Sequence, residues 1–494
     1  MTLRVLLEAM ETPSYAGDSD VEVRGLCADS RRVRPGDLFF ALAGLHQDGG
    51  AFVQQALAAG AVAAVVEPRV GGEALPLVRV REPRRALAQA ADRFHGHPSR
   101  ALAVVGITGT NGKTTTTWLL ESVFRAAALR PGVLGTTGAR LDGVARPLGY
   151  TTPEATELQA LLREMADRGI EAVALELSSH ALAQRRCFAL ECDVAVFTNL
   201  SHDHLDYHGT LAAYLDAKLM LFDGRNNPRP VKRAAAVVNA DDPVAEAVAD
   251  AARRGGMRVV RFGEVVTAEV RIARVAPVAE GLTVELAAEG SRFAIRLPLL
   301  GRYNAWNAAG AFAAARALDL APERVVAGLE AVTGVPGRLE RVSAGQPFEV
   351  VVDYAHTPDA LERALAALRE HVRGRVLAVF GCGGDRDRAK RPVMGRVARS
   401  GADEVWVTSD NPRSEDPAEI ARAILNGAGG AGGPVHLELD RRAAIAAALG
   451  AAREGDVVLV AGKGHETTQT IGSRVLPFDD REVARELLRP GGRA

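Results

Sequence analysis

The middle of the chain alternates between short apolar runs and amphipathic stretches. Apolar runs that predict buried strands lie at 102–109 (LAVVGITG), 170–179 (IEAVALELSS) and 192–200 (CDVAVFTNL). The stretch 113–129 (KTTTTWLLESVFRAAAL) predicts a helix directly after the first of these runs. Strands that alternate with helices indicate a parallel sheet with helices on both faces. Residues 267–301 instead alternate with a period of two, which predicts antiparallel hairpins.

The two flanking parts of the chain show a similar α/β alternation. In the first part, apolar runs at 36–42 and 61–67 lie on either side of a helical pattern. The last part contains further apolar runs, each followed by a helical pattern, at 348–355, 375–383, 403–411 and 456–464. We therefore predict an α/β protein with a small first domain, a central parallel-sheet domain and a Rossmann-like third domain. The predicted domains are 1–98, 99–334 and 335–494.

Composition and charge narrow the class of protein. Of the 494 residues, 47% are hydrophobic and 24% are charged, as is usual for globular proteins. The net charge of −1 creates no field that would attract nucleic acid. No uncharged apolar run approaches the ~20 residues of a membrane span, and the N-terminus shows no signal peptide. The four cysteines are scattered without a C-x-x-C pair, which fits a reducing compartment. We expect a cytoplasmic protein that neither binds nucleic acid nor inserts into membranes.

A glycine-rich turn follows the first central strand and precedes a helix. Its residues are Gly109, Thr110, Asn111, Gly112, Lys113, Thr114 and Thr115. Backbone N–H groups and the positive end of a helix bind phosphate, so this turn predicts an ATP site. Lys113 would reach the β- and γ-phosphates, and the Thr114 hydroxyl would bind Mg²⁺. Ile107 stands where the usual P-loop has its first glycine, so only the shorter G-x-x-G-K-T form is present. A glycine-rich turn that binds no ligand is the alternative.

Two further positions are candidates for a metal site. Glu176 ends one apolar strand, and a histidine cluster that includes His204 follows the next strand. Ligands bind at the carboxyl ends of parallel strands, so Glu176 and His204 could hold Mg²⁺ near the γ-phosphate. The alternatives are a zinc site or a polar loop without metal. Lys218 lies in a helical pattern among Leu, Met and Phe, and its residues alone favour an ammonium that reaches solvent.

Seven segments together resemble the Mur ligases, the ATP-dependent amide-forming enzymes of peptidoglycan synthesis. They are GTNGKTT, ELSSH, NLSHDHLDYHG, YLDAK, GRYNAWNAAGA, GRLE and DYAHTPDAL. The segments ADSRRVRPGDLFFAL, YTTPEATELQ and GCGGDRDRAKRPVMG are similar to one member of that family. That member adds the third residue of the stem peptide to UDP-N-acetylmuramoyl-L-alanyl-D-glutamate. The resemblance implies a uridine-binding first domain, an ATP-binding central domain and an amino-acid-binding third domain.

The resemblance also implies roles for residues around the nucleotide. Lys218 matches a lysine that the family carbamylates, and its carbamate would help Glu176 and His204 to hold a second Mg²⁺. Lys113, Glu176, His204 and Lys218 are therefore the predicted catalytic residues. Asn304 and Asn307 match a helix that contacts adenine, and Arg338 and Asp353 match third-domain residues that close onto ATP. His356 receives no role.

Contacts to the UDP-linked dipeptide follow from the same resemblance. The matching residues are Ser30, His46, Gln47, Thr151, Thr152, Ser178, Gln184 and Arg186. Tyr150 stands where relatives often have Asn, which places one polar contact in question. The implied small-molecule substrates are this dipeptide and an amino acid, and the protein is expected to be a monomer.

The sequence TSDNPRSEDP indicates which amino acid is added. Asp410, Asn411, Pro412 and Arg413 match the signature of the family members that use meso-diaminopimelate. The carboxylate at the far end of diaminopimelate is absent from lysine, and a guanidinium such as Arg413 can bind it bidentately. Asn411 could bond to both the amine and the carboxylate. Further matching contacts are Arg386, Gly462 and Glu466, with Glu466 taking the distal ammonium. Without the family, DNPR could be an Asx turn.

The expected reaction is amide formation through an acyl phosphate. The D-glutamate γ-carboxylate would attack ATP, and the amine of diaminopimelate would then displace phosphate. The third domain would have to swing toward the central one. Three alternatives are a lysine-adding ligase of the same family, a folylpolyglutamate synthase and a nucleotide-hydrolysing switch or scaffold.

Overall fold

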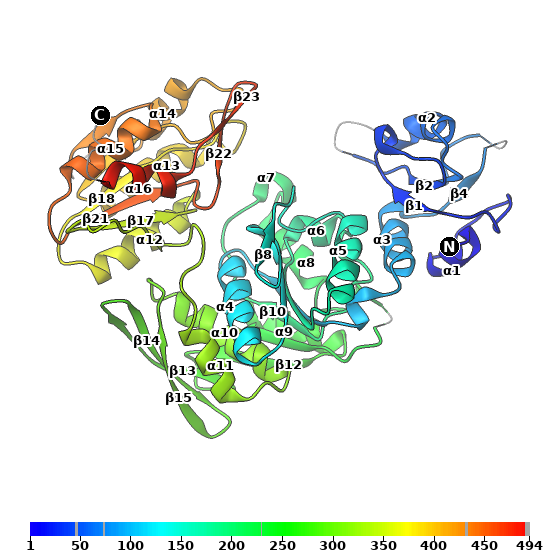
Figure 1. Ribbon diagram of the computed structural model, residues 1–494, viewed down its shortest axis with the longest axis horizontal. Coiled ribbons are helices and arrows are strands. Elements are labelled where there is room, and N and C mark those ends of the chain that lie inside the picture. The colour runs from blue at the N-terminus through cyan, green and yellow to red at the C-terminus, as the bar shows by residue number, and fades with distance from the viewer. Residues whose placement is uncertain (45–47, 73–74, 229, 430–432, 490–494) are drawn as a thin grey trace.

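The computed structural model describes residues 1–44, 48–72, 75–228, 230–429 and 433–489, which form three α/β units in chain order. Figure 1 shows the first unit in blue, the central unit in cyan to green, and the last unit in yellow to red. Each unit contains one sheet of four or more strands, and a separate two-stranded hairpin belongs to the last unit. The predicted α/β fold class is confirmed, whereas the residues that divide the domains stay a prediction.

The first unit is a parallel sheet in the order β1-β2-β3-β4. Its strands are β1 (Gly25–Cys27), β2 (Asp37–Phe40), β3 (Ala63–Val66) and β4 (Leu77–Arg79). Its helices are α1 (Leu3–Ala9), α2 (Val53–Ala58) and α3 (Pro83–Phe94). All residues of β2 and β3 are buried, as their unbroken apolar runs predict for a sheet covered on both faces.

The central sheet has eleven strands in the order β15-β14-β13-β12-β11-β10-β5-β9-β6-β7-β8. Its strands are β5 (Ala103–Thr108), β6 (Pro131–Gly135), β7 (Gly138–Leu141), β8 (Val144–Arg146), β9 (Ala172–Glu176), β10 (Val194–Phe197), β11 (Ala235–Asn239), β12 (Arg258–Gly263), β13 (Val270–Val278), β14 (Gly281–Ala288) and β15 (Ser291–Leu297). The strands from β12 to β6 are parallel, and β13–β15 are antiparallel neighbours, as their period of two predicts. The antiparallel strands β7 and β8 at the other edge carry no signal that we recognised in the sequence.

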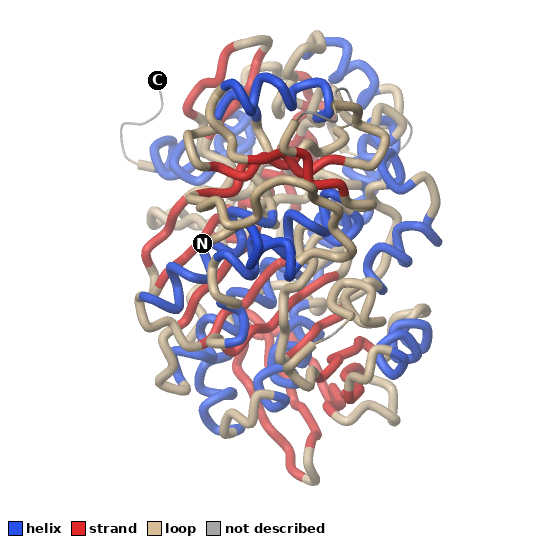
Figure 2. Tube along the Cα trace, turned by 90° about the vertical axis from the view of Figure 1, so that its right-hand side faces the viewer, coloured by secondary structure: helices blue, strands red, loops and turns tan. Residues whose placement is uncertain are grey.

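Helices cover both faces of the central sheet. They are α4 (Lys113–Ala126), α5 (Ala155–Asp167), α6 (Ser179–Ala183), α7 (Leu205–His208), α8 (Leu211–Leu219), α9 (Ala245–Arg254), α10 (Asn304–Ala317) and α11 (Pro322–Glu330). One core lies between the sheet, α4, α10 and α11, and a second core lies between the sheet, α5 and α9. Strands β13–β15 extend away from the body at its lower end in both views (Figures 1 and 2).

The last unit has a six-stranded sheet in the order β16-β17-β21-β18-β19-β20. Its strands are β16 (Glu340–Arg341), β17 (Glu349–Asp353), β18 (Val376–Phe380), β19 (Glu404–Val407), β20 (Val435–Leu437) and β21 (Val457–Ala461), and the hairpin is β22 (Thr468–Ile471) with β23 (Arg474–Pro477). Its helices are α12 (Pro358–His371), α13 (Lys390–Gly401), α14 (Pro417–Leu425), α15 (Arg441–Ala451) and α16 (Asp480–Leu488). The strands from β17 to β20 are parallel. The expectation of a helix directly after the fourth apolar run is wrong, because β21 leads first into the hairpin.

No helix among the described residues is long and apolar enough to cross a membrane. The longest apolar segments are instead strands and alanine-rich helices that other elements cover. Helix α10 is an example, because almost all of its residues are buried between α4 and the sheet.

Candidate nucleotide and amino-acid site

The loop after β5 lines a cavity of about 630 Å³ between the central and last units. All seven residues of the predicted phosphate loop, 109–115, line this cavity. The loop lies at the carboxyl end of a strand in the middle of the parallel sheet, where ligands of such sheets bind. Helix α4 begins at Lys113, so its positive end faces the same space. The reading of this segment as a turn without a site therefore loses support.

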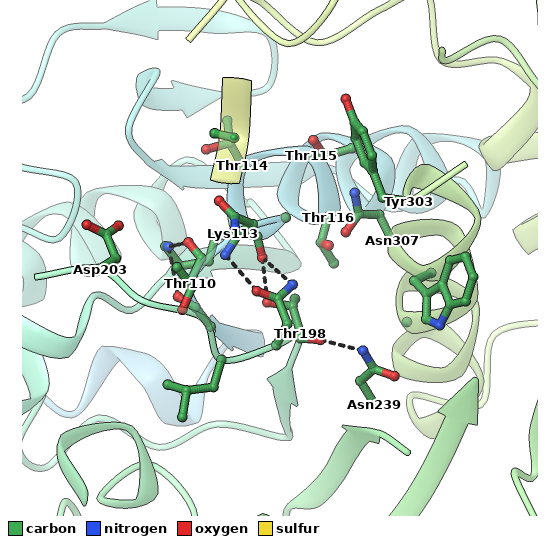
Figure 3. Close-up of a pocket in the computed structure, with 18 of the residues that line it drawn as sticks. Thr110, Lys113, Thr114, Thr115, Thr116, Thr198, Asp203, Asn239, Tyr303 and Asn307 are labelled. Atoms are coloured by element: carbon green, nitrogen blue, oxygen red, sulfur yellow. Dashed lines mark hydrogen bonds between the residues drawn. The ribbon is translucent and has the colours of Figure 1, made fainter. Parts of the chain in front are cut away.

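Lys113 is held over the loop by two backbone carbonyls. Its Nζ donates to Gly109 O at 2.9 Å and to Thr110 O at 2.8 Å. Figure 3 shows Lys113 next to Thr110. In the same view, Asn239 donates a hydrogen bond to Thr198 O at 2.7 Å. Burial lowers the pKa of Lys113, and the negative charge of Glu176 opposes that shift. The ammonium of Lys113 faces the cavity at the N-terminal end of α4, which is where a residue that binds phosphate must lie.

Gly112 allows the loop to pass close to helix α10. Its φ is +88°, and a Cβ there would lie 2.3 Å from Asn307 Oδ1. Any side chain at this position would therefore meet both backbone strain and a clash. Asn307 lines the cavity and donates to Asn304 Oδ1 at 2.7 Å. Asn304 in turn donates to Leu300 O and supports Asn307 from behind, without lining the cavity itself.

Glu176 is buried at the end of β9 and points into the same cavity. Its two carboxylate oxygens accept from the N–H of Thr136 at 2.9 Å and from the hydroxyl of Thr136 at 3.0 Å. These contacts hold the carboxylate in one orientation. Gly135 is required beside it, because a Cβ there would lie 2.3 Å from Glu176 Oε1.

Lys218 is buried in α8, with 1% of its surface exposed, so the expected reach to solvent is wrong. Its Nζ lies 4.2 Å from the centre of the Tyr214 ring, and no hydrogen bond to it is present among the described residues. Burial and the repulsion of Lys113 hold its pKa well below the usual value. A lowered pKa favours the unprotonated amine, which is the form that adds CO₂.

His204 lies opposite these groups at the N-terminus of α7. Burial lowers the pKa of His204, and Asp203, whose carboxylate is 3.5 Å away, opposes the shift. A neutral imidazole is the form that binds metals. Glu176, His204, Lys218 and Thr114 all line the one cavity.

Thr114, Glu176 and His204 alone provide too few ligands for Mg²⁺, so further oxygen ligands are needed. No cluster of three or more His, Cys, Asp and Glu side chains in the described part of the chain could hold a metal ion. The orphaned amine of Lys218 is consistent with a carbamate, which would replace a buried cation by a hard oxygen ligand. Oxygen ligands and a single histidine favour Mg²⁺ over zinc.

The last unit contributes the other wall of the cavity. Arg338 Nη2 donates to Thr114 Oγ1 at 3.3 Å, and its guanidinium lies 4.8 Å from the centre of the Tyr354 ring. Asp353 lines the cavity and accepts from the backbone N–H groups of Leu339 and Ala355. Burial raises the pKa of Asp353, against the effect of Arg338. The structure therefore brings both predicted third-domain residues to the phosphate loop.

Residues predicted to contact the dipeptide form one network next to Glu176. Thr152 Oγ1 donates to Glu176 O at 2.7 Å and accepts from the N–H of Ser178 at 3.0 Å. Arg186 donates to Thr152 O at 3.1 Å and to Gln184 Oε1 at 2.6 Å. Thr151 and Ser178 reach the cavity.

Tyr150 contacts one of the predicted dipeptide residues. The Arg186 guanidinium lies 4.6 Å from the centre of the Tyr150 ring, although the Tyr150 residue is 58% exposed. Of the three predicted residues of the first domain, Ser30 is not part of this network. Ser30 donates to Gln55 Oε1 at 3.3 Å within the first unit, and His46 and Gln47 lie outside the described residues.

Residues predicted to bind the amino acid form a second cluster, built from the ends of β19 and β21. Asp410 and Asn411 follow β19 and are buried, and Gly462 follows β21. A Cβ on Gly462 would lie 2.5 Å from Asp410 Oδ2, so the two loops touch. Asn411 Nδ2 donates to Glu466 Oε2 at 2.8 Å.

Arg413 and Arg386 belong to the same cluster of loops. Arg413 Nη1 donates to Gly384 O at 2.6 Å, and the N–H of Gly384 donates to Asn411 O at 2.9 Å. Arg386 is exposed and donates to Asp385 O at 3.3 Å. No carboxylate among the described residues forms an ion pair with Arg413.

Sequence reasoning missed several residues that connect the two clusters. Tyr354 lines the cavity, and burial together with the charge of Glu466 raises its pKa to about 12. Asp359 accepts from Asn111 of the phosphate loop at 3.1 Å. Lys463 is completely buried beside Asn411 and Glu466. Tyr354 and Asp359 lie in DYAHTPDAL, and Lys463 lies between the predicted contacts Gly462 and Glu466, so the sequence had singled out their segments but not these residues.

Comparison with known proteins agrees with this architecture. Three family models match the chain: "Mur ligase family, catalytic domain" over 22–95, "Mur ligase middle domain" over 107–315 and "Mur ligase, glutamate ligase domain" over 337–464. The chain is 43% identical over 490 residues to a Geobacillus thermodenitrificans protein, with 99% of each chain covered. It is 45% identical over 484 residues to a Streptomyces coelicolor protein, covering 96% of this chain and 94% of the relative. Both relatives are named UDP-N-acetylmuramoyl-L-alanyl-D-glutamate–2,6-diaminopimelate ligase.

Solved structures give the same result. A structure of a UDP-N-acetylmuramoyl-L-alanyl-D-glutamate–2,6-diaminopimelate ligase is 34% identical, covers 99% of this chain and 98% of its own, and has a TM-score of 0.71. A Mycobacterium tuberculosis folylpolyglutamate synthase shares the fold at 22% identity, covering 76% of this chain and 91% of its own, with a TM-score of 0.63. The chain therefore belongs to the Mur ligase family and is an ATP-dependent ligase of the acid–amino-acid class.

Proposed function

We propose that this ligase joins meso-diaminopimelate to the γ-carboxylate of the D-glutamate in UDP-N-acetylmuramoyl-L-alanyl-D-glutamate, in peptidoglycan synthesis. The observation that carries the proposal is Arg413, a half-buried guanidinium that forms no ion pair with any described carboxylate. A distal carboxylate on the amino acid would supply that missing partner. The names of the relatives support the same substrates. The enzyme would act as a cytoplasmic monomer.

The residues around the cavity would bind ATP and direct the first step. The loop 109–115 and Lys113 would hold the phosphates, Asn307 with Asn304 behind it would face the adenine, and Arg338 and Asp353 would close the other side. Thr114, Glu176, His204 and carbamylated Lys218 would hold Mg²⁺. When bound, Mg²⁺ would neutralise charge on the phosphates.

The two reactions would use the two clusters in turn. The network of Thr151, Thr152, Ser178, Gln184 and Arg186 would place the γ-carboxylate next to the γ-phosphate, with Ser30, His46 and Gln47 binding the uridine end. Attack of the γ-carboxylate on ATP forms an acyl phosphate and ADP. The amine of diaminopimelate, in its unprotonated form, then attacks the acyl carbon; the acyl–oxygen bond breaks, and phosphate leaves with the proton that the nitrogen releases. Lys113 would stabilise the charge on the transferred phosphoryl group.

The amino acid would be held by the cluster of Arg386, Asp410, Asn411, Pro412, Arg413, Gly462 and Glu466. Tyr354 connects this cluster with the cavity, because it lines the cavity and experiences the charges of Glu466 and Asp410. A lysine-adding ligase is disfavoured because it would leave the Arg413 guanidinium without an ion pair, with only the more distant charge of Asp385 to act on it.

Phosphate release from ATP, measured with the UDP-linked dipeptide and either meso-diaminopimelate or L-lysine, tests the proposal. We expect turnover with diaminopimelate and an amide product of the corresponding mass. Lys113→Met serves as the inactive control and should lower kcat by about 100- to 1000-fold. Turnover with lysine alone would overturn the choice of amino acid. ATP hydrolysis that is indifferent to both amino acids would instead favour a nucleotide-dependent switch.

A further inference from the structure

Lys463 is a completely buried lysine at the centre of the amino-acid cluster. Its Nζ donates to Glu466 Oε2 at 3.1 Å, to Asn411 Oδ1 at 3.4 Å and to Thr468 O at 2.5 Å. An ammonium has three N–H donors, so all of its donors have acceptors inside the protein. Lys463 therefore has no donor left for a substrate, and any influence on one must pass through these neighbours.

The first neighbour is the amide of Asn411. Its Oδ1 accepts from the N–H of Thr470 at 2.9 Å and from Lys463, while its Nδ2 donates to Glu466. An amide oxygen has two lone pairs, so the acceptor capacity of Asn411 is used. Of the two N–H groups on Asn411 Nδ2, only one remains for a substrate. Asn411 can thus donate to a carboxylate, but it can accept from the substrate's amine only if Lys463 or Thr470 moves. The sequence-based expectation that Asn411 serves both groups therefore needs a rearrangement.

The second neighbour is Glu466. Its Oε2 receives hydrogen bonds from both Lys463 and Asn411, and its side chain is 31% exposed. No hydrogen bond to its Oε1 is present among the described residues. The buried ammonium compensates the charge of this carboxylate inside the cluster. Glu466 therefore forms an ion pair with Lys463, whereas the Arg413 guanidinium forms no ion pair with a described carboxylate.

Strand β22 connects Lys463 with Arg413. Lys463 binds Thr468 O at the start of the strand, Asn411 binds the N–H of Thr470, and the N–H of Arg413 donates to Thr470 O at 3.0 Å. The side chains of Lys463 and Asn411 and the backbone of Arg413 thus share one short strand as their support. A change at Lys463 would reach Arg413 through this strand as well as through charge.

We propose that Lys463 is a positioning residue that sets the preference of this site for an amino acid with a distal carboxylate. By occupying the acceptor of Asn411 and pairing with Glu466, it leaves the Asn411 N–H and the Arg413 guanidinium for an anion. Without it, Glu466 would be an uncompensated carboxylate in the amino-acid cluster, and the site would accept the more cationic lysine more readily. This inference rests on the proposed function, since it concerns the same amino-acid site.

The test compares kcat/KM for meso-diaminopimelate and for L-lysine in wild type, Lys463→Met and Lys463→Gln. Both variants should lower the diaminopimelate-to-lysine ratio by about tenfold, the effect of one charged contact. The KM values for ATP and for the dipeptide should change by less than about twofold, since Lys463 contacts neither nucleotide loop nor dipeptide network. Lys232→Met is a matched control, because it removes a Lys–Asp193 pair of 2.6 Å in the central unit. An unchanged ratio in a folded Lys463 variant overturns the proposal.

Glu466→Gln provides a second, independent arm that leaves the buried lysine in place. Removing the charge of Glu466 leaves the ammonium of Lys463 uncompensated, which makes the cluster more positive. The diaminopimelate-to-lysine ratio of kcat/KM should therefore rise, although kcat/KM should fall for both amino acids. A ratio that falls or stays constant in Glu466→Gln also overturns the proposal, whether or not the Lys463 variants fold. Failure of the proposed function is distinguishable, because wild type itself would then form no product with diaminopimelate.

Discussion

Asn111 of the phosphate loop donates a hydrogen bond from Nδ2 to Asp359 Oδ2 at 3.1 Å, although the two residues are 248 positions apart. Asn111 belongs to the central unit, whereas Asp359 lies in the first turn of α12 in the last unit. Ser201 donates to the same carboxylate oxygen at 3.4 Å, and Arg363 holds its other oxygen at 3.0 Å. The phosphate loop and the last unit are thus joined directly beside the cavity.

Replacement of Asp359 should weaken this connection. Because a hydrogen bond to a charged group contributes about 1.5–3 kcal/mol when buried, and this one is partly exposed, we expect Asp359→Ala to lower kcat/KM for ATP about three- to tenfold. Steady-state kinetics at varied ATP measures this effect. Glu362→Ala, an exposed carboxylate on the same helix, is the control and should change nothing. Equal effects of the two substitutions would show that the contact has no role.

Arg413→Lys should separate charge from geometry in the amino-acid cluster. A lysine keeps the positive charge but loses the bidentate fork, so kcat/KM for diaminopimelate should fall about a hundredfold while KM for ATP stays within about twofold. Arg422→Lys, at an exposed position of α14, is the matched control. If both variants retain full activity with diaminopimelate, Arg413 does not bind the distal carboxylate.

Removal of Arg441 should destabilise the last unit. Its guanidinium and Asp480 form an ion pair of 2.7 Å with both side chains 0% exposed, and it also donates to Ser409 O and Ala461 O. Arg441→Met leaves Asp480 buried without a partner, which costs about 3–5 kcal/mol of unfolding free energy. Urea denaturation monitored by circular dichroism measures the loss. The double variant Arg441→Met/Asp480→Leu should recover part of it, and a single variant as stable as wild type would contradict the prediction.

The stability of the protein should fall with acid because of His465. Burial, and then the charge of Arg338, lowers the pKa of His465 to about 4. Below its ordinary pKa of about 6.5 the unfolded chain takes up a proton that the folded chain does not. The stability present above pH 6.5 is therefore lost as the pH falls toward 4, by up to about 3 kcal/mol. His465→Asn should flatten the dependence of unfolding free energy on pH over this range. His436→Asn, at an exposed position, should not.

Local patterns were sufficient for the elements that build the site. Strand β5, the glycine-rich loop and α4 are consecutive in the chain, so the order apolar run, glycine turn and amphipathic stretch predicted them correctly. The antiparallel region β13–β15 followed from its period of two in the same way. The edge strands β7 and β8 did not, because each has only three or four residues, too few for a clear period, and β8 is also exposed throughout.

The sequence by itself therefore determined the elements that build the site, where the phosphate loop lies, and, through the spacing of its motifs, the family of the protein. Only the tertiary structure decided the environment of Lys218, which the residues alone placed in solvent and which the packing of α8 buries beside Tyr214. It also decided the partners of Glu176, Asn111 and Lys463, which come from other elements or loops. The physical reason is that burial and charge depend on what other elements bring into contact, and such contacts leave no period or spacing in the chain.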